Sequence, residues 1–236
     1  MWVIKIGGSW IKNPRLDELI GLISNFRNEN ITLVVGGGCF ADSVRDVFSY
    51  TKMTQKTANF LALKATEIFA YFLKEKNKNL FLTSDMNEFF KGKVRVWLPS
   101  LELSANSSFE KNWGSTSDSV AAWLYSHSRP PRNNLKKYDH MKGLIFIKSL
   151  NFEMKKKYKL NQLQKKNILD KNVKKYLIQT NWIWNWQSLT QRRGDTSRPY
   201  EYSAGFLKIA GPEVIELLKK SPDWSSFILR LSDIIY

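Results

Sequence analysis

The chain has 236 residues with a hydrophobic share of 43% and an aromatic share of 14%, which exclude a disordered protein and allow one sizeable α/β domain or two small ones. Its only cysteine, Cys39, excludes an internal disulfide framework. No apolar run reaches the roughly 20 residues of a membrane span. Because the sequence also starts without a leader pattern, we expect a cytoplasmic protein. The net charge of +16 fits anionic partners such as phosphorylated metabolites, nucleotides or nucleic acid, although biased genome composition explains a lysine-rich chain equally well.

The first predicted element is a buried strand at residues 3–6, which runs directly into Gly7, Gly8 and Ser9. Backbone N–H groups at glycines that follow a strand are open to a ligand and suit phosphate. Lys5 interrupts the apolar strand, so its ammonium could reach whatever lies over the loop. Taken alone, an ordinary turn beside a solvent-facing lysine explains the same residues.

The next stretch repeats the order of strand, glycines and helix. Asn13 and Pro14 suit the N-cap and the first position of a helix. Residues 31–35 are a nearly continuous apolar run, typical of a parallel strand covered on both faces, and they end at a glycine triplet. The triplet is Gly36, Gly37 and Gly38, and the apolar face of the following helix is predicted at Phe40, Val44, Val47 and Phe48. Two such units predict a parallel sheet with ligand loops at the carboxyl ends of its strands.

The middle of the chain continues the alternation. It predicts a helix at 54–76, strands at 80–83 and 94–98, a short helix at 85–90 and a polar loop at 99–112. The buried stripe of the long helix is predicted at Leu61, Ile68, Phe69 and Phe72. Further on, serine and aspartate before an apolar run predict a helix that begins near Asp118, where the helix dipole favours a carboxylate.

The remaining sequence is less regular. It predicts a connection at 128–137, a strand at 144–148, a solvent-exposed lysine-rich helix or hairpin at 153–175, a helix at 213–220 and a closing strand at 227–229. Trp182, Trp184 and Trp186 fit either a strand or a stacked cluster. Trp123 is expected in the core, and His127 and His140 in structural or exposed positions rather than catalytic ones.

Three patches now follow one another in order: Lys5 to Ser9, the glycine triplet with Asp42 four residues later, and residues 116–119. Their order and spacing resemble the amino acid kinase superfamily, which includes acetylglutamate kinase, uridylate kinase, aspartokinase and isopentenyl phosphate kinase. With Trp113, the later patches look like the aminomethylfuran-methyl phosphate kinases of methanofuran biosynthesis. The resemblance implies an α/β fold, a three-layer αβα sandwich with a mainly parallel central sheet. It also implies a single domain 1–236, with an acceptor-binding lobe at 1–137 and a nucleotide-binding lobe at 138–236.

The resemblance also implies a reaction and roles for individual residues. The family transfers the γ-phosphoryl group of ATP to a small acceptor, a reaction that needs charge neutralisation and alignment. Lys5 resembles the lysine at the transferring phosphoryl group, and Asp118 the aspartate that orients it. The implied nucleotide-binding residues are Gly7, Gly8, Ser9, Lys148 and Ser149. The implied acceptor-binding residues are Gly36, Gly37, Gly38, Asp42, Arg45 and Ser117, with Arg45 on an acceptor phosphate. ATP and Mg²⁺ are the implied cofactors; the nucleotide's phosphates hold the metal, so no metal ligands are expected in the chain.

Each patch alone has a simpler interpretation: a turn, a helix cap at Asp118, a solvent-facing Arg45. Relatives commonly place Asp-Gly after the strand at 144–148, where this chain has Lys148 and Ser149. Gly205 and Lys208 do not have the spacing of the second-lysine motif of some relatives, so neither is given that role. A kinase of the same fold for an amino acid or nucleoside monophosphate stays open, as does a non-catalytic nucleotide-binding relative in an assembly. We expect a small phosphorylated or carboxylate acceptor, a homo-oligomer, no membrane contact and no nucleic acid, because the lysines lack interleaved aromatics.

Overall fold

The computed structural model describes residues 1–90, 93–128, 143–178 and 206–235. Within these residues, eight strands form one central sheet in the order β3-β4-β2-β1-β5-β7-β8-β6. Neighbouring strands are parallel except β7 and β8. The strands are β1 (Trp2–Ile6), β2 (Ile31–Val35), β3 (Phe81–Thr83), β4 (Val94–Trp97), β5 (Gly143–Ile147), β6 (Lys157–Lys159), β7 (Phe206–Ala210) and β8 (Ser232–Ile235).

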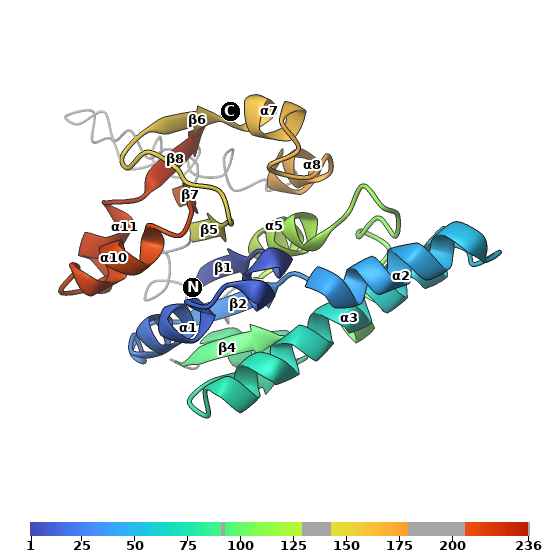
Figure 1. The fold of residues 1–236 in the computed structure, drawn as a ribbon, viewed down its shortest axis with the longest axis horizontal. Helices are drawn as coiled ribbons and strands as arrows, with labels where there is room; N and C mark the ends of the chain where they lie inside the picture. Colours follow the sequence, from blue (N-terminus) through green and yellow to red (C-terminus); the bar gives the residue numbers. More distant parts are fainter. Residues whose placement is uncertain (91–92, 129–142, 179–205, 236) are drawn as a thin grey trace, which may run out of the picture.

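Helices cover both faces of this sheet (Figure 1). One hydrophobic cluster joins the sheet to α1, α10 and α11, and a second joins its other face to α5, α7 and α8. The helices are η1 (Gly8–Lys12), α1 (Leu16–Ser24), α2 (Gly38–Tyr50), α3 (Gln55–Lys76), η2 (Met86–Phe90), α4 (Ser100–Ala105), α5 (Ser117–His127), α7 (Leu160–Lys165), α8 (Val173–Ile178), α10 (Val214–Lys219) and α11 (Trp224–Ile228). The predicted αβα sandwich with a mainly parallel sheet is confirmed.

The three central strands place their loops at one edge of the sheet. The last residues of β1, β2 and β5 (Ile6, Val35 and Ile147) lie side by side in the register. Backbone hydrogen bonds continue one residue further, with Gly7 N donating to Ile147 O at 2.9 Å and Gly36 N donating to Ile6 O at 2.9 Å. Because the strands are parallel, both glycine loops and the residue after β5 leave the sheet together.

Two helix interiors differ from the prediction. In α3, Ile68 and Phe72 are 50% and 38% exposed, whereas Phe69 is buried. The rest of the buried face contains Ala58, Leu63, Ala65, Ala70 and Leu73. Small residues on this face let the helix approach its neighbours closely, so spacing judged from the large side chains selected the wrong stripe. In α2, Phe40, Val44 and Phe48 are half-buried, whereas Val47 is 39% exposed and the small Ala41 is buried.

The first helix begins two residues later than predicted, but the predicted capping contact is present. Helix α1 begins at Leu16, after the short helix η1. The Asn13 side chain accepts a hydrogen bond from Arg15 N at 2.9 Å, and its backbone is extended, as in an N-cap residue that bonds the second position of a helix beginning at Pro14. Asparagine is preferred at the N-cap because its side chain satisfies such a backbone N–H group.

Some of the remaining local predictions are confirmed and others are wrong. The loop predicted at 99–112 contains α4, and the segment at 153–175 contains β6, α7 and the start of α8, with several of its apolar side chains buried. The strand predicted at 227–229 is wrong because α11 occupies those residues, with Asp223 accepting from Ser226 N at 2.7 Å as its cap. Trp123 lies in the core as predicted, and His127 stacks on it with ring centroids 4.2 Å apart. The predictions for residues 129–137, the three alternating tryptophans, His140 and Gly205 fall outside the described residues.

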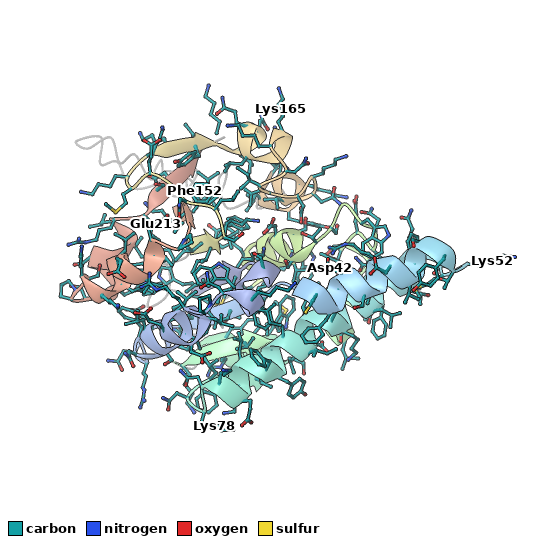
Figure 2. The ribbon with its side chains drawn as sticks, in the orientation of Figure 1. Asp42, Lys52, Lys78, Phe152, Lys165 and Glu213 are labelled. Atoms are coloured by element: carbon teal, nitrogen blue, oxygen red, sulfur yellow. The ribbon has the colours of Figure 1, made fainter. Side chains whose placement is uncertain are left out.

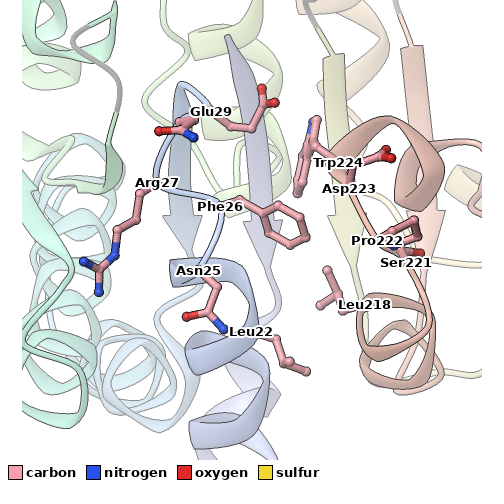
Figure 3. Close-up of a pocket in the computed structure, with 11 residues that line it drawn as sticks. Leu22, Asn25, Phe26, Arg27, Glu29, Leu218, Ser221, Pro222, Asp223 and Trp224 are labelled. Carbon is pink, nitrogen blue, oxygen red and sulfur yellow. The ribbon is translucent and has the colours of Figure 1, made fainter.

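A pocket of about 420 Å³ lies near the amino end of β2, the end opposite the glycine loops. Figure 3 shows its walls, formed by the end of α1 and the segment between α10 and α11. Phe26 and Trp224 meet there edge to face, with centroids 5.1 Å apart. It is therefore separate from the polar residues at the carboxyl ends of the strands. Among the described residues, no helix has the length and apolar character needed to span a membrane.

Candidate active site

The two glycine loops touch each other. A Cβ added to Gly8 would lie 2.3 Å from Gly38 N, and one added to Gly36 would lie 2.4 Å from Gly8 N. Gly38 has a φ of +53°, in the left-handed region that favours glycine. These positions need glycine because backbone meets backbone, a contact that the sequence alone did not reveal.

The loops differ in which N–H groups they can offer a ligand. Gly7 N and Gly36 N donate within the sheet. The following residues, Gly8 and Ser9, open η1, and Gly38 opens α2 after its N-cap residue Gly37. N–H groups in the first turn of a helix lack intrahelical acceptors and attract anions. Two such helix starts therefore converge at the joined loops.

A buried cluster of charges lies beside the joined loops. Lys5 Nζ is 2.8 Å from Asp118 Oδ1, and Lys148 Nζ is 2.8 Å from Oδ1 and 2.6 Å from Oδ2 of the same carboxylate. The side chains of Lys5, Asp118 and Lys148 are only 6%, 6% and 12% exposed. The structure thus brings together the two predicted catalytic residues and adds Lys148, which had been assigned only to nucleotide binding.

Local structure explains how these three side chains meet. Lys5 shares a face of β1 with Val3, the face that packs against α5. Asp118 is the second residue of α5, and Lys148 is the first residue after β5, with its backbone oxygen held by Trp10 Nε1 at 3.1 Å. Three separate elements therefore fix the cluster.

The cluster carries one positive charge in excess. Burial, and after it the like charge of Lys5, lower the pKa of Lys148 to about 8, while Asp118 acts in the opposite direction. Burial acts to raise the pKa of Asp118, but Lys5 and Lys148 outweigh it and hold that pKa below its ordinary value. Two ammonium groups on one carboxylate leave donor capacity for a further anion.

The predicted acceptor residues divide into two groups. Ser117 lies at the joined loops, with its Oγ 3.2 Å from a Cβ built on Gly36. Asp42 and Arg45 lie further along α2, about 6 and 10 Å from its start at 1.5 Å per residue. They form an exposed ion pair, and the Arg45 guanidinium lies 5.7 Å from the centre of the Trp113 ring. Figure 2 labels Asp42 on α2.

Ser149 and Lys208 lie outside the charge cluster. Ser149 is exposed beside Lys148, and no hydrogen bond to another described residue fixes its side chain. Lys208 lies on β7 and pairs with Asp233 at 2.8 Å, so it does not join the charge cluster.

Asp170 is a residue that the sequence did not single out. Its carboxylate accepts hydrogen bonds from Thr116 and Ser119, the N-cap and third residue of α5, more than 50 positions away. Asp170 stands within a lysine-rich stretch, and its position three residues before α8 is the one local signal that could have marked it as a cap.

A carboxylate bridging two lysines, beside two glycine loops at the carboxyl ends of parallel strands, lies where α/β proteins typically bind ligands and is a candidate anion-binding site. The family model described as "Amino acid kinase family" matches residues 1–134, more than half of the chain. The chain belongs to the amino acid kinase family.

Individual relatives give further comparisons. The chain is 28% identical over 130 residues to a [5-(aminomethyl)furan-3-yl]methyl phosphate kinase of Methanocaldococcus jannaschii; the match covers 52% of this chain and 59% of that relative. Uridylate kinase from Archaeoglobus fulgidus superposes with a TM-score of 0.60 at 14% identity, covering 99% of both chains. UMP kinase from Bacillus anthracis gives 0.54 at 11% identity, covering 99% of this chain and 94% of that one. These structures show the same fold.

Proposed function

We propose that this protein is an ATP-dependent small-molecule kinase that transfers the γ-phosphoryl group to a phosphate or carboxylate acceptor. The observation that carries the proposal is the buried Asp118 carboxylate between two lysine ammonium groups, next to the joined glycine loops. Membership of the amino acid kinase family supports the same reaction.

The cluster has the features that phosphoryl transfer requires. Charge develops on the oxygens between donor and acceptor, and fixed cations in a dehydrated site stabilise it. Lys5 and Lys148 supply those cations, and Asp118 holds both ammonium groups in place without exposing them to water. The first turns of η1 and α2 offer backbone donors to the nucleotide and to the acceptor respectively. Removal of one preorganised donor of this kind typically costs about 2.7–4 kcal/mol of transition-state stabilisation.

The site also fits a magnesium nucleotide. Two helix starts and two lysines give the donors that a triphosphate needs, while the Asp118 carboxylate already accepts from both lysines. In the described part of the chain, no group of three or more His, Cys, Asp or Glu side chains could hold a metal ion. Mg²⁺ would be held mainly by the phosphate oxygens of the nucleotide and by water, and when bound it would neutralise phosphate charge.

For the acceptor, we propose [5-(aminomethyl)furan-3-yl]methyl phosphate, the substrate named in the relative from M. jannaschii, and hence a step of methanofuran-type biosynthesis. Arg45 can offer its guanidinium to the acceptor phosphate from the face of α2 that it shares with Asp42, with Trp113 beneath it. Residues 1–137 would then bind the acceptor and residues 138–236 the nucleotide. A cytoplasmic homo-oligomer completes the proposal, and light scattering of the purified protein tests its oligomeric state.

The decisive experiment measures ADP release from ATP and Mg²⁺ in the presence of this furan phosphate, with UMP and acidic amino acids as alternative acceptors. Wild type should release ADP, Lys5→Ala should not, and the exposed Lys12→Ala variant should match wild type. Turnover with another acceptor would keep the kinase and replace its substrate. Absence of ADP release with every acceptor, with Lys5→Ala indistinguishable from wild type, would refute the kinase.

A further inference from the structure

The start of α8 holds the loop that precedes α5. Asn172 Nδ2 donates to Ser115 Oγ at 2.9 Å and to Glu110 Oε2 at 2.9 Å. Tyr176 Oη accepts from Glu110 N at 2.9 Å. These contacts join residues that are about 60 positions apart in the chain. The segment from 170 to 176 therefore forms one wall of the loop that leads to Asp118.

Asp170 makes the closest of these attachments. One carboxylate oxygen, Oδ2, accepts from Thr116 N at 2.9 Å, Thr116 Oγ1 at 2.7 Å and Ser119 N at 3.0 Å. The other, Oδ1, accepts from Ser119 Oγ and from Val173 N at 3.2 Å. Asp170 thus caps α5 and α8 together. Thr116 itself supplies no side-chain cap to α5, so the cap of that helix comes from a distant part of the chain.

Asp118 lies between the two residues of α5 that Asp170 holds. Thr116 is the N-cap and Ser119 the third residue of the helix, so the turn that carries Asp118 has both its ends bonded to Asp170. The direction of the Asp118 carboxylate toward Lys5 and Lys148 depends on that turn. A shift of the turn would move the carboxylate away from the ammonium groups it orients.

We propose that Asp170 is a positioning residue of the phosphoryl-transfer site, which fixes Asp118 between its two lysines by capping α5 from the C-terminal half of the chain. Asp170 lies beyond residues 1–134, which match the family model. The C-terminal half of the chain therefore contributes Asp170 to the site in addition to Lys148. The role in turnover rests on the proposed kinase function, whereas the positioning of Asp118 does not.

The charge of Asp170 provides a readout that a purely structural cap would lack. The charged groups that act on the Lys148 ammonium are Lys5 on β1, Asp118 on α5 and Asp170 before α8, and Asp170 raises the pKa of Lys148. Asp170→Asn keeps the shape but places an N–H₂ group against donors and removes the negative charge. The pKa of Lys148 should then fall below its value of about 8.

The experiment compares Asp170→Asn with Asp223→Asn. Asp223 caps α11, beside the pocket at the other end of the sheet, so its variant makes the same substitution in a helix cap away from the site. Three quantities are measured: the thermal midpoint, kcat with ATP and the acceptor, and the titration of Lys148 by NMR of ¹³C-labelled lysine. Asp170→Asn should lower kcat by about 10- to 100-fold and shift the Lys148 titration to lower pH. Asp223→Asn should change only the thermal midpoint.

Each outcome bears on the proposal. A lower thermal midpoint in Asp170→Asn with wild-type kcat and an unshifted Lys148 titration would overturn it, because Asp170 would then be a structural cap alone. If Asp170→Asn does not fold, Ser119→Ala and Thr116→Val remove single donors and should give smaller losses of kcat in the same direction. The NMR titration needs no turnover, and Ser119→Ala keeps the Asp170 charge while it removes a donor to Asp170. A Lys148 titration shifted by Ser119→Ala in a protein without kinase activity would therefore refute the proposed function and keep the positioning role.

Discussion

The contact between the two glycine loops makes Gly8→Ala a direct test of the site's geometry. The added methyl group would lie 2.3 Å from Gly38 N and 2.7 Å from Gly38 Cα, and both atoms belong to the backbone. No side-chain rotation can relieve that overlap. Reaching an ordinary contact of 3.4 Å requires a relative shift of the loops by about 1 Å.

A shift of this size separates the donor side of the site from the acceptor side. Misplacement of reacting groups by about 1 Å can lower a rate by about 100-fold, which corresponds to about 2.7 kcal/mol of activation free energy. We therefore predict that kcat of Gly8→Ala, measured as ADP release at saturating ATP and acceptor, falls by about that factor. The variant should keep its helical circular dichroism, since the overlap is confined to two loops.

Gly21→Ala provides the matched control. The same methyl group at this position in α1 meets nothing within 4 Å. Wild-type activity is expected, together with a gain of about 0.5–1 kcal/mol in unfolding free energy, because glycine weakens a helix interior. A folded Gly8→Ala protein with the kcat of Gly21→Ala would refute the reasoning that close contact of the loops sets the reaction geometry.

Three further predictions concern the charged residues. Lys148 has a pKa of about 8 in the folded protein, so kcat/KM should fall as the pH rises through that value and Lys148 loses its proton. The Lys148→Arg variant stays charged and should remove this decline from the pH profile. Asp118→Asn removes the carboxylate that two buried ammonium groups share. Urea unfolding at pH 7 should therefore show a loss of about 3–5 kcal/mol in unfolding free energy, with a smaller loss at pH 9, where Lys148 is largely neutral. Equal losses at both pH values would contradict the pKa assigned to Lys148. Arg45→Ala should raise KM for a phosphorylated acceptor by about 10- to 100-fold and leave KM for ATP and the thermal midpoint unchanged, because its exposed ion pair with Asp42 adds little stability.

The central sheet and its loops could be predicted because their signals are local. The strands β1, β2 and β5 are fully buried and nearly continuous in apolar residues, as expected for parallel strands covered on both faces. Gly36 to Gly38 follow such a run directly, and Lys5 stands out as a charge within one. Strong contrast between neighbouring residues therefore indicated both the strands and the Lys5 and Asp118 candidates.

What could not be predicted depends on packing between distant segments. Whether a helix buries its large or its small residues is decided by its neighbours, so the alanine-rich face of α3 was missed. The bond from Lys148 to Asp118 spans 30 positions, and that from Asp170 to Ser119 spans 51. Neither spacing carries a periodic signal, and the lysine-rich composition around Asp170 suggested a solvent-exposed surface instead.

The central claim is that Lys5 acts on the transferring phosphoryl group in a site organised by Asp118. Single-turnover transfer of the γ-phosphoryl group from ATP to the acceptor, measured by rapid quench in wild type and Lys5→Met, tests it most directly, with ATP affinity measured separately by calorimetry. We predict a transfer rate about 100- to 1,000-fold lower in Lys5→Met, with a much smaller change in ATP affinity. Transfer at the wild-type rate in a folded Lys5→Met protein would contradict the claim.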